Sequence, residues 1–238
     1  MHPNRFPMTA TVLLLAASIS LPAAAQDHPA TTTPTQPTTG VQTFELRPSG
    51  ISRISFQSDA PLETLEGVST QTTGSFTVDL ANATRQLSGR VQIPVSSLGT
   101  GVAMRDEHLR GANWLDAAHH PNIALELVRT TVRASTPGRP ARGEVVARLT
   151  LHGQTREVRV PVQVRYVPLD PREHAGMDQV GINANMLRVK GTMRVRLSDF
   201  GVDIMSILRL KVANDIDIRL DLTAFQTSGA PAATPAAR

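Results

Sequence analysis

Cysteine is absent from the 238-residue sequence, which excludes disulfide bonds and a catalytic thiol. The apolar core must therefore supply the stability of the folded chain. Aromatic residues make up only 3% of the sequence, and Lys190 and Lys211 are its only lysines. The formal net charge is +4, carried almost wholly by scattered arginines. This excess is too small and too dispersed to predict binding of nucleic acid.

Long apolar runs are also missing, with one exception near the start of the chain. Residues 9–21 read TATVLLLAASISL, preceded by Arg5 and followed by small residues at 23–25. This pattern is typical of a cleaved export signal, and the run is short for a transmembrane helix. We therefore expect residues 1–25 to be a signal peptide and the mature protein, without a transmembrane segment, to be periplasmic or secreted.

Two polar segments flank the central part of the sequence. Residues 26–42 are rich in threonine and proline and show no apolar period, which predicts a disordered linker. Residues 227–238 have a similar composition and predict a disordered tail. One globular domain is therefore expected between them, over residues 43–226.

The strongest signal in that domain is an alternation of apolar and polar residues. In EVRVPVQVRYV, Val158 to Tyr166 place every second side chain on an apolar face, and arginines occupy the other face. The segments LRVKGTMRVRL and DIDIRLDL repeat the pattern. Such a period of two is typical of strands with one buried and one solvated face, which favours an antiparallel sheet.

The number and spacing of these segments predict the fold class. Eight to ten strands are expected, separated by Gly, Pro and Asn turns, and only the stretch from Met104 to Gly111 has helical character. Many strands with one apolar face each, and no helical layer, indicate an all-β fold, either a closed antiparallel barrel or a sandwich.

The segment MRDEHLRGANWLDAAHHP (104–121) gathers histidines, acids and the only tryptophan. His108, His119 and His120 lack the HxxxH spacing that places two ligands on one helix face, so we expect no metal there. Asp106 and Arg110 are spaced as a helical charge pair rather than as paired catalytic carboxylates. With no activated nucleophile elsewhere, no catalytic residue and no cofactor are predicted.

Three blocks, in order, carry a family resemblance: SLGTGVAMRDEHL with WLDAAHHP, then LTLHGQTREV, then LSDFGV. Together they resemble the YceI-like family of bacterial periplasmic proteins over roughly residues 44–224. Many relatives begin the domain with a histidine-containing pattern, which SRISFQSDAP replaces here. No site residue is therefore carried over from that segment.

The resemblance implies a lipocalin-like antiparallel barrel of about eight strands that holds an isoprenoid or another long apolar lipid, without catalysis. Burial of a prenyl chain contributes about 0.8 kcal/mol per carbon, so ten carbons supply roughly 8 kcal/mol before ordering costs. The aromatic-poor composition predicts a pore lined by aliphatic side chains and methionine. The residues expected to line it are Phe76, Val78, Ile93, Met104, Leu109, Trp114, Leu115, Leu125, Leu149, Val160, Val162, Met186, Met193 and Val195.

Within the 104–121 segment, we expect a short helix and turn that close one end of the pore. Met104, Leu109, Trp114 and Leu115 are predicted to pack inward, and Arg105, Glu107 and Arg110 to face water.

Two other functions stay open on the sequence alone. A structural or stress-related barrel would fill its interior with side chains. A lipid-modifying enzyme would need an acid-base pair at the pore mouth, and Asp106, Glu107 and His108 are the first candidates. The sequence does not decide the oligomeric state, a homodimer included.

Overall fold

The computed structural model describes residues 40–48, 50–133, 137–170 and 176–227. The predicted signal peptide (1–25), most of the predicted linker and nearly all of the predicted tail lie outside these residues. The first strand begins at Val41, so the last residues of the predicted linker belong to the sheet. Among the described helices, none is both long enough and apolar enough to cross a membrane.

The described residues form ten strands, one α-helix and four short 3-10 helices. The strands are β1 (Val41–Leu46), β2 (Arg53–Asp59), β3 (Thr64–Ser69), β4 (Thr73–Asp79), β5 (Leu87–Pro94), β6 (Asn122–Thr130), β7 (Ala141–Leu151), β8 (Gln154–Val167), β9 (Met186–Arg196) and β10 (Asp215–Gln226). The helices are α1 (Ala103–Arg110), η1 (Val95–Ser97), η2 (Met177–Val180), η3 (Leu197–Phe200) and η4 (Ser206–Leu208).

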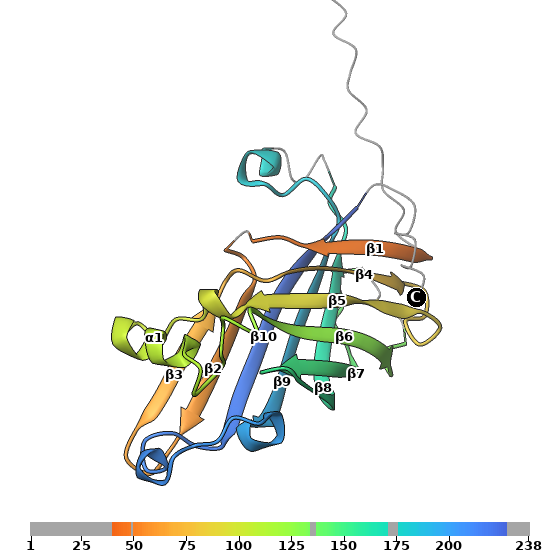
Figure 1. The fold of residues 1–238 in the computed structure, drawn as a ribbon. Helices are drawn as coiled ribbons and strands as arrows, with labels where there is room; N and C mark the ends of the chain where they lie inside the picture. The colour runs from red at the N-terminus through yellow and green to blue at the C-terminus, as the bar shows by residue number, and fades with distance from the viewer. Residues whose placement is uncertain (1–39, 49, 134–136, 171–175, 228–238) are drawn as a thin grey trace, which may run out of the picture. The chain divides into compact units, whose positions relative to one another are not determined.

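All strand pairs are antiparallel, in the order β1-β4-β5-β6-β7-β8-β9-β10-β2-β3 (Figure 1). β1 also pairs with β10 through Phe44–Gln226 and Glu45–Phe225, which closes eight strands into a barrel. The all-β prediction is confirmed, and of its two alternatives the closed barrel is correct. The predicted helix is confirmed as α1, within one residue at each end.

The apolar residues of the alternating pattern face the inside of the barrel, and the polar residues face the outside. Val160, Val162 and Tyr166 of β8 are buried, while Arg159 and Arg165, each next to one of them in the sequence, are exposed. β9 follows the same pattern, and β10 does so as far as Leu222, beyond which its residues are buried on both faces. Since side chains alternate across a strand, one apolar face per strand is enough to build the apolar interior.

The outward faces carry charge pairs between neighbouring strands. Arg194 donates two hydrogen bonds to the Asp217 carboxylate, at 2.7 and 2.9 Å, and Arg188 donates two to Asp221, both at 2.9 Å. These hydrogen bonds hold the pKa of the Asp217 and Asp221 carboxyls below the ordinary value. The arginines predicted on a solvated surface thus pair with acids on adjacent strands.

We expect these pairs to make the barrel sensitive to acid. Their carboxyls have a lower pKa in the folded chain than in the unfolded one, so their contribution is complete above about pH 5 and is lost as the pH falls through the folded values. The double variant Asp217→Asn, Asp221→Asn should show a smaller fall in Tm between neutral and acid pH. At neutral pH its Tm should drop by less than about 8 °C, because exposed pairs contribute little.

Thermal melts from pH 7 to pH 3 measure this effect. The exposed helix variant Glu107→Gln serves as the control and should keep the pH profile of the parent protein. A double variant whose Tm falls as steeply with acid as that of the parent would contradict the expectation.

Candidate functional site

The two ends of the barrel are built differently. At one end, β1 pairs with the end of β10 around Phe225 and Gln226. At the other end, β2 pairs with β10 from Ile216 to Asp221, and β3 extends beyond β2. Figure 1 shows the β2–β3 hairpin and α1 at this same end. The extra hairpin widens the barrel there, and we call this end the wide end.

Polar contacts attach the hairpin to the segment that leads into α1. The N–H of Val68 donates to the carbonyl of Gly99 at 2.8 Å, and the N–H of Gly99 donates back at 3.0 Å. Arg105 of α1 pairs with Glu63 at 3.2 Å between Nη2 and Oε1. The wall of the wide end is therefore continuous from β10 through β2 and β3 to α1.

A cavity of about 470 Å³ lies inside the wide end. A cavity of about 150 Å³ holds one benzene molecule, which has six carbons. Scaled by volume from that case, the cavity has room for roughly 19 carbon atoms, close to four isoprene units. The lining is mostly aliphatic, with Phe56 and Trp114 as its aromatic rings and with polar side chains near the opening. Its apolar lining includes Ile54, Leu65, Ile93, Leu98, Leu109, Leu115, Ile123, Leu149, Leu151, Met193, Val195, Val202, Leu208, Val212, Ile216 and Ile218.

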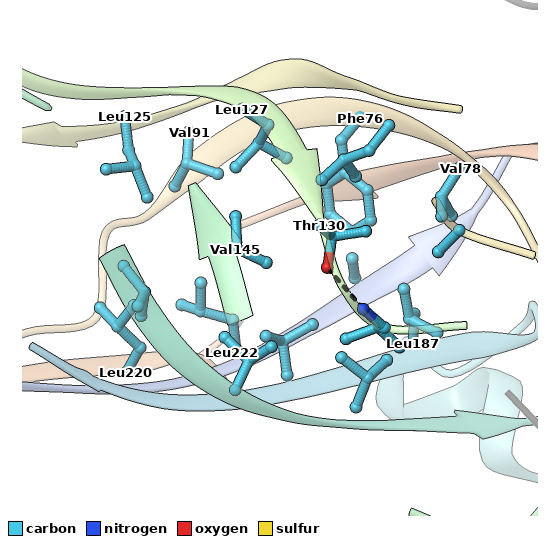
Figure 2. A pocket seen from close by; sticks show the side chains of 18 of the residues that line it. Phe76, Val78, Val91, Leu125, Leu127, Thr130, Val145, Leu187, Leu220 and Leu222 are labelled. Atoms are coloured by element: carbon cyan, nitrogen blue, oxygen red, sulfur yellow. Dashed lines mark hydrogen bonds between the residues drawn. The ribbon is translucent and has the colours of Figure 1, made fainter. Parts of the chain in front are cut away.

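A second cavity of about 100 Å³ continues the interior toward the other end. Figure 2 shows its apolar side chains converging from opposite walls of the barrel. The hydroxyl of Thr130 in this lining accepts from the N–H of Val132 at 3.1 Å (Figure 2). The same hydroxyl donates to the Glu144 carbonyl at 2.8 Å. Its polar atom is thus paired within the wall. Val91, Leu125, Leu220 and Leu222 line both cavities.

Buried side chains fill the narrow end, where β1 meets β10. Phe44 is fully buried, stacks on Phe76 with ring centroids 5.7 Å apart, and meets Tyr166 edge to face at 6.4 Å. Gln226 accepts a hydrogen bond from Asn185 at 2.8 Å and lies within 3.4 Å of the Tyr166 hydroxyl. Burial raises the pKa of Tyr166, so the phenol stays protonated at neutral pH. These residues form a plug, and a ligand would enter from the wide end.

The predicted closure around α1 is correct in part. Leu115 is buried, and Leu109 and Trp114 are partly buried against the core. Met104 is 68% exposed, so its predicted inward packing is wrong, although it borders the cavity opening. The helix has only about two turns and contains no fully buried residue.

The charged residues of α1 also differ from the prediction. Arg110 does not face water freely, because it is partly buried and its Nη2 donates to the Leu98 carbonyl at 3.0 Å. Arg105 is held by Glu63, and Glu107 is exposed as expected.

Asp106 accepts hydrogen bonds from both the N–H and the hydroxyl of Thr100, at 2.7 and 2.6 Å. These bonds lower the pKa of the Asp106 carboxyl, whereas a general acid at neutral pH needs a raised one. In the described part of the chain no close ion pair joins Asp106 to Arg110, but the charge of Arg110 also lowers the pKa of Asp106, so the predicted charge pair is present only as a longer-range attraction. Asp106 instead fastens the segment before α1 to the helix.

The structure brings most of the predicted pore residues together around the two cavities. Leu125 borders both, and Met186 borders neither. Met186 precedes the inward Leu187 on β9, so the alternation of the strand places it on the outer face. The smaller cavity is bordered by Phe76, Val78, Val160 and Val162. The larger cavity is bordered by Ile93, Met104, Leu109, Trp114, Leu115, Leu149, Met193 and Val195.

Several lining residues were missed by the sequence analysis. Ile54 and Phe56 lie on β2, where the alternation in RISFQSD was the available signal. Leu208 and Val212 lie in and after η4, a segment without period, and nothing in the sequence assigned them to the interior.

Large apolar side chains are exposed around the wide opening. Ile207 is 81% exposed in η4, and Leu62 is 69% exposed between β2 and β3. The N–H of Leu62 donates to the Leu210 carbonyl at 2.9 Å, which joins the two loops. We call Leu62, Met104, Met205, Ile207 and Leu210 the apolar rim.

Comparison with known proteins agrees with this geometry. The family profile of the YceI-like domain matches residues 45–224. A UPF0312 protein of Vibrio cholerae is 29% identical over 132 residues, covering 56% of this chain and 61% of that protein. A UPF0312 protein of Pseudomonas syringae pv. tomato is 31% identical over 129 residues, covering 54% and 59%. The chain thus matches about three fifths of the length of these curated relatives.

Solved structures share the fold. A polyisoprenoid binding domain from Saccharophagus degradans superposes with a TM-score of 0.59 at 13% identity, covering 78% of this chain and 99% of that one. BcnA of Burkholderia cenocepacia superposes with a TM-score of 0.55 at 20% identity, covering 72% and 95%. At these identities the likeness concerns the fold, and it matches the closed barrel described above.

Proposed function

Because this chain belongs to the YceI-like domain family, we propose that it binds a polyisoprenoid, or a similarly long branched apolar lipid, inside the barrel. The observation that carries the proposal is the aliphatic cavity of about 470 Å³ at the wide end. A similar fold from Saccharophagus degradans is described as a polyisoprenoid binding domain, which supports the same ligand class here. The protein sequesters the lipid or carries it through an aqueous compartment.

The dimensions of the interior set the length of chain that is enclosed. The two adjoining cavities, of about 470 and 100 Å³, hold roughly 23 carbons by the benzene measure, close to five isoprene units. A longer chain extends through the opening or displaces lining side chains. Affinity should therefore rise with chain length up to about this size and then level off.

The role is proposed to be non-catalytic and the location periplasmic or secreted. Several polar groups near the opening are engaged in structural contacts, as in the Arg105–Glu63 pair and the Asp106–Thr100 hydrogen bonds, whereas His108 and Lys211 also line the cavity. The signal sequence expected in residues 1–25 supports export. A barrel with a filled core is less well supported, because side chains fill only the narrow end.

The full chain, purified from its own host without detergent, tests the proposal. Native mass spectrometry and an organic extract should both reveal an apolar lipid bound at up to one molecule per chain. Lipid-free protein should then bind a prenyl alcohol of four or five units and gain in Tm. A protein that carries no lipid and whose Tm does not respond to such an alcohol would refute the proposal.

Uptake of the lipid into the barrel through the apolar rim gives a separate prediction. If the rim enters a bilayer during uptake, replacing Leu62 and Ile207 by aspartate should slow lipid transfer from vesicles by more than about tenfold, because two apolar insertions are lost. The affinity for a soluble short-chain prenyl alcohol should not change, since neither residue lines the cavity.

Stopped-flow transfer of a fluorescent prenyl lipid from vesicles measures this rate. Val41→Asp is the matched control, because Val41 is 44% exposed at the opposite end of the barrel. Equal slowing by the control and the rim variant would argue against a specific entry site.

A further inference from the structure

Three potential metal ligands from two separate loops meet at the wide end. Asp116 and His120 lie in the loop between α1 and β6, and His152 lies in the turn between β7 and β8. One ligand atom from each of these residues lies within 4.8 Å of the other two, and all three residues are partly buried. Bonds of about 2.0–2.2 Å to a tetrahedral ion place donor atoms roughly 3.4 Å apart, so modest side-chain rotations would complete such a site.

The backbone at two of these residues is strained. Asp116 has φ of 46° and His152 has φ of 48°, and among the residues that the structure describes they alone have positive φ without being glycine. Aspartate and histidine tolerate this conformation better than most residues, but it still costs free energy. At His152 the two-residue hairpin turn with Gly153 itself requires this conformation, whereas Asp116 adopts it in the loop before β6. In both cases the side chain lies in the same cluster.

A hydrogen bond orients His152 as a metal ligand. Its Nδ1 lies 3.1 Å from the carbonyl oxygen of Phe200 in η3. A carbonyl only accepts, so Nδ1 carries the proton and Nε2 keeps the free lone pair. This is the arrangement by which an outer hydrogen bond fixes the tautomer of a ligating histidine.

His120 occupies space that Gly153 leaves free. The two histidine rings lie edge to face, with centroids 5.3 Å apart. A Cβ at position 153 would lie only 2.6 Å from Cε1 of His120, so a residue with a side chain would displace the ring. Asp116 accepts from Nδ1 of the exposed His119 at 2.9 Å, which orients the carboxylate from outside the cluster.

We propose that Asp116, His120 and His152 bind a divalent transition-metal ion such as Zn²⁺. Two imidazoles and one carboxylate leave the fourth position for water, as in three-ligand zinc sites. Asp116 follows Leu115 and His152 follows Leu151, and both leucines line the larger cavity. The ion therefore fastens the loop after α1 to the β7–β8 turn in the cavity wall.

This site revises the expectation that the sequence holds no metal site. The spacing of His119 and His120 still gives no reason for them to share an ion, and His119 is not among the three ligands. His152 is far from the other two in the sequence, so ligand spacing within one segment could not reveal the cluster.

Calorimetric titration of Zn²⁺ into the chelator-treated full chain, without lipid, tests the site. One ion per chain should bind, and zinc at a hundredfold excess over Kd should raise Tm by about 5–10 °C. His152→Asn should weaken zinc binding by more than about a hundredfold. This variant keeps its turn, because Asn-Gly is the favoured pair for a two-residue hairpin with positive φ. His120→Gln should weaken binding to the same extent.

His108→Gln is the matched control and should bind zinc like the parent protein, because His108 is not among the three ligands. His119→Gln removes the outer partner of Asp116 and should weaken zinc binding by about ten- to a hundredfold, less than the loss of a ligand. Absence of stoichiometric zinc binding, or equal binding by His120→Gln and the parent, would overturn the proposal. Because no lipid takes part, the result is independent of the proposed lipid binding.

Discussion

Met193→Trp is expected to weaken binding of a prenyl chain by more than about a hundredfold while the barrel stays folded. Met193 faces inward from β9, is opposite Ile218 on β10, and lines the larger cavity with it. A tryptophan that excludes about four carbons of the ligand removes about 3 kcal/mol of burial energy. Overpacking should cost little here, because the larger side chain extends into existing space.

Thr192→Trp is the control for this variant. Thr192 is the preceding residue, lies opposite Arg219 and is exposed on the outer face. Titration of lipid-free protein with a prenyl alcohol should show near-parental affinity for Thr192→Trp and a large loss for Met193→Trp. Equal affinities of the two variants would place the ligand outside this cavity.

Phe44→Ala is expected to lower the free energy of unfolding by about 3–5 kcal/mol, the usual cost of removing a buried phenylalanine. Phe44 is fully buried in the plug and contacts both Phe76 and Tyr166. For a domain of this size the Tm should fall by about 10 °C or more.

The same variant should also lengthen the pore. Phe76 lines the smaller cavity, so removing the ring stacked on it opens space beyond that cavity. Chains longer than five isoprene units should then gain affinity relative to shorter ones, measured in the same titrations. Glu45→Ala, the next residue, changes only a surface ion pair with Arg47 and should leave Tm almost unchanged. A similar Tm for Phe44→Ala and Glu45→Ala would refute the plug.

Much of the barrel interior was predictable because strand geometry is local. Side chains alternate across a strand, so the apolar positions of the strands containing Val160 and Val195 identified their inward faces before any pairing was known. Met186 was predicted to line the pore because methionine suits a flexible apolar ligand. The alternation along the strand contradicts this, since counting back from the inward Val189 places position 186 on the outer face. The error at Met104 has another cause, because a helix of two turns has too few residues to define a buried face.

The sequence by itself determined the antiparallel all-β class, the apolar interior and the short α-helix from Ala103 to Arg110, since each follows from local periodicity. Only the tertiary structure decided that β2 and β3 widen one end, that Phe44 and Tyr166 fill the other, and that His152 meets Asp116 and His120. These features depend on which strands pair and in which register. Pairing joins residues that are far apart in the chain, and no local pattern encodes that choice.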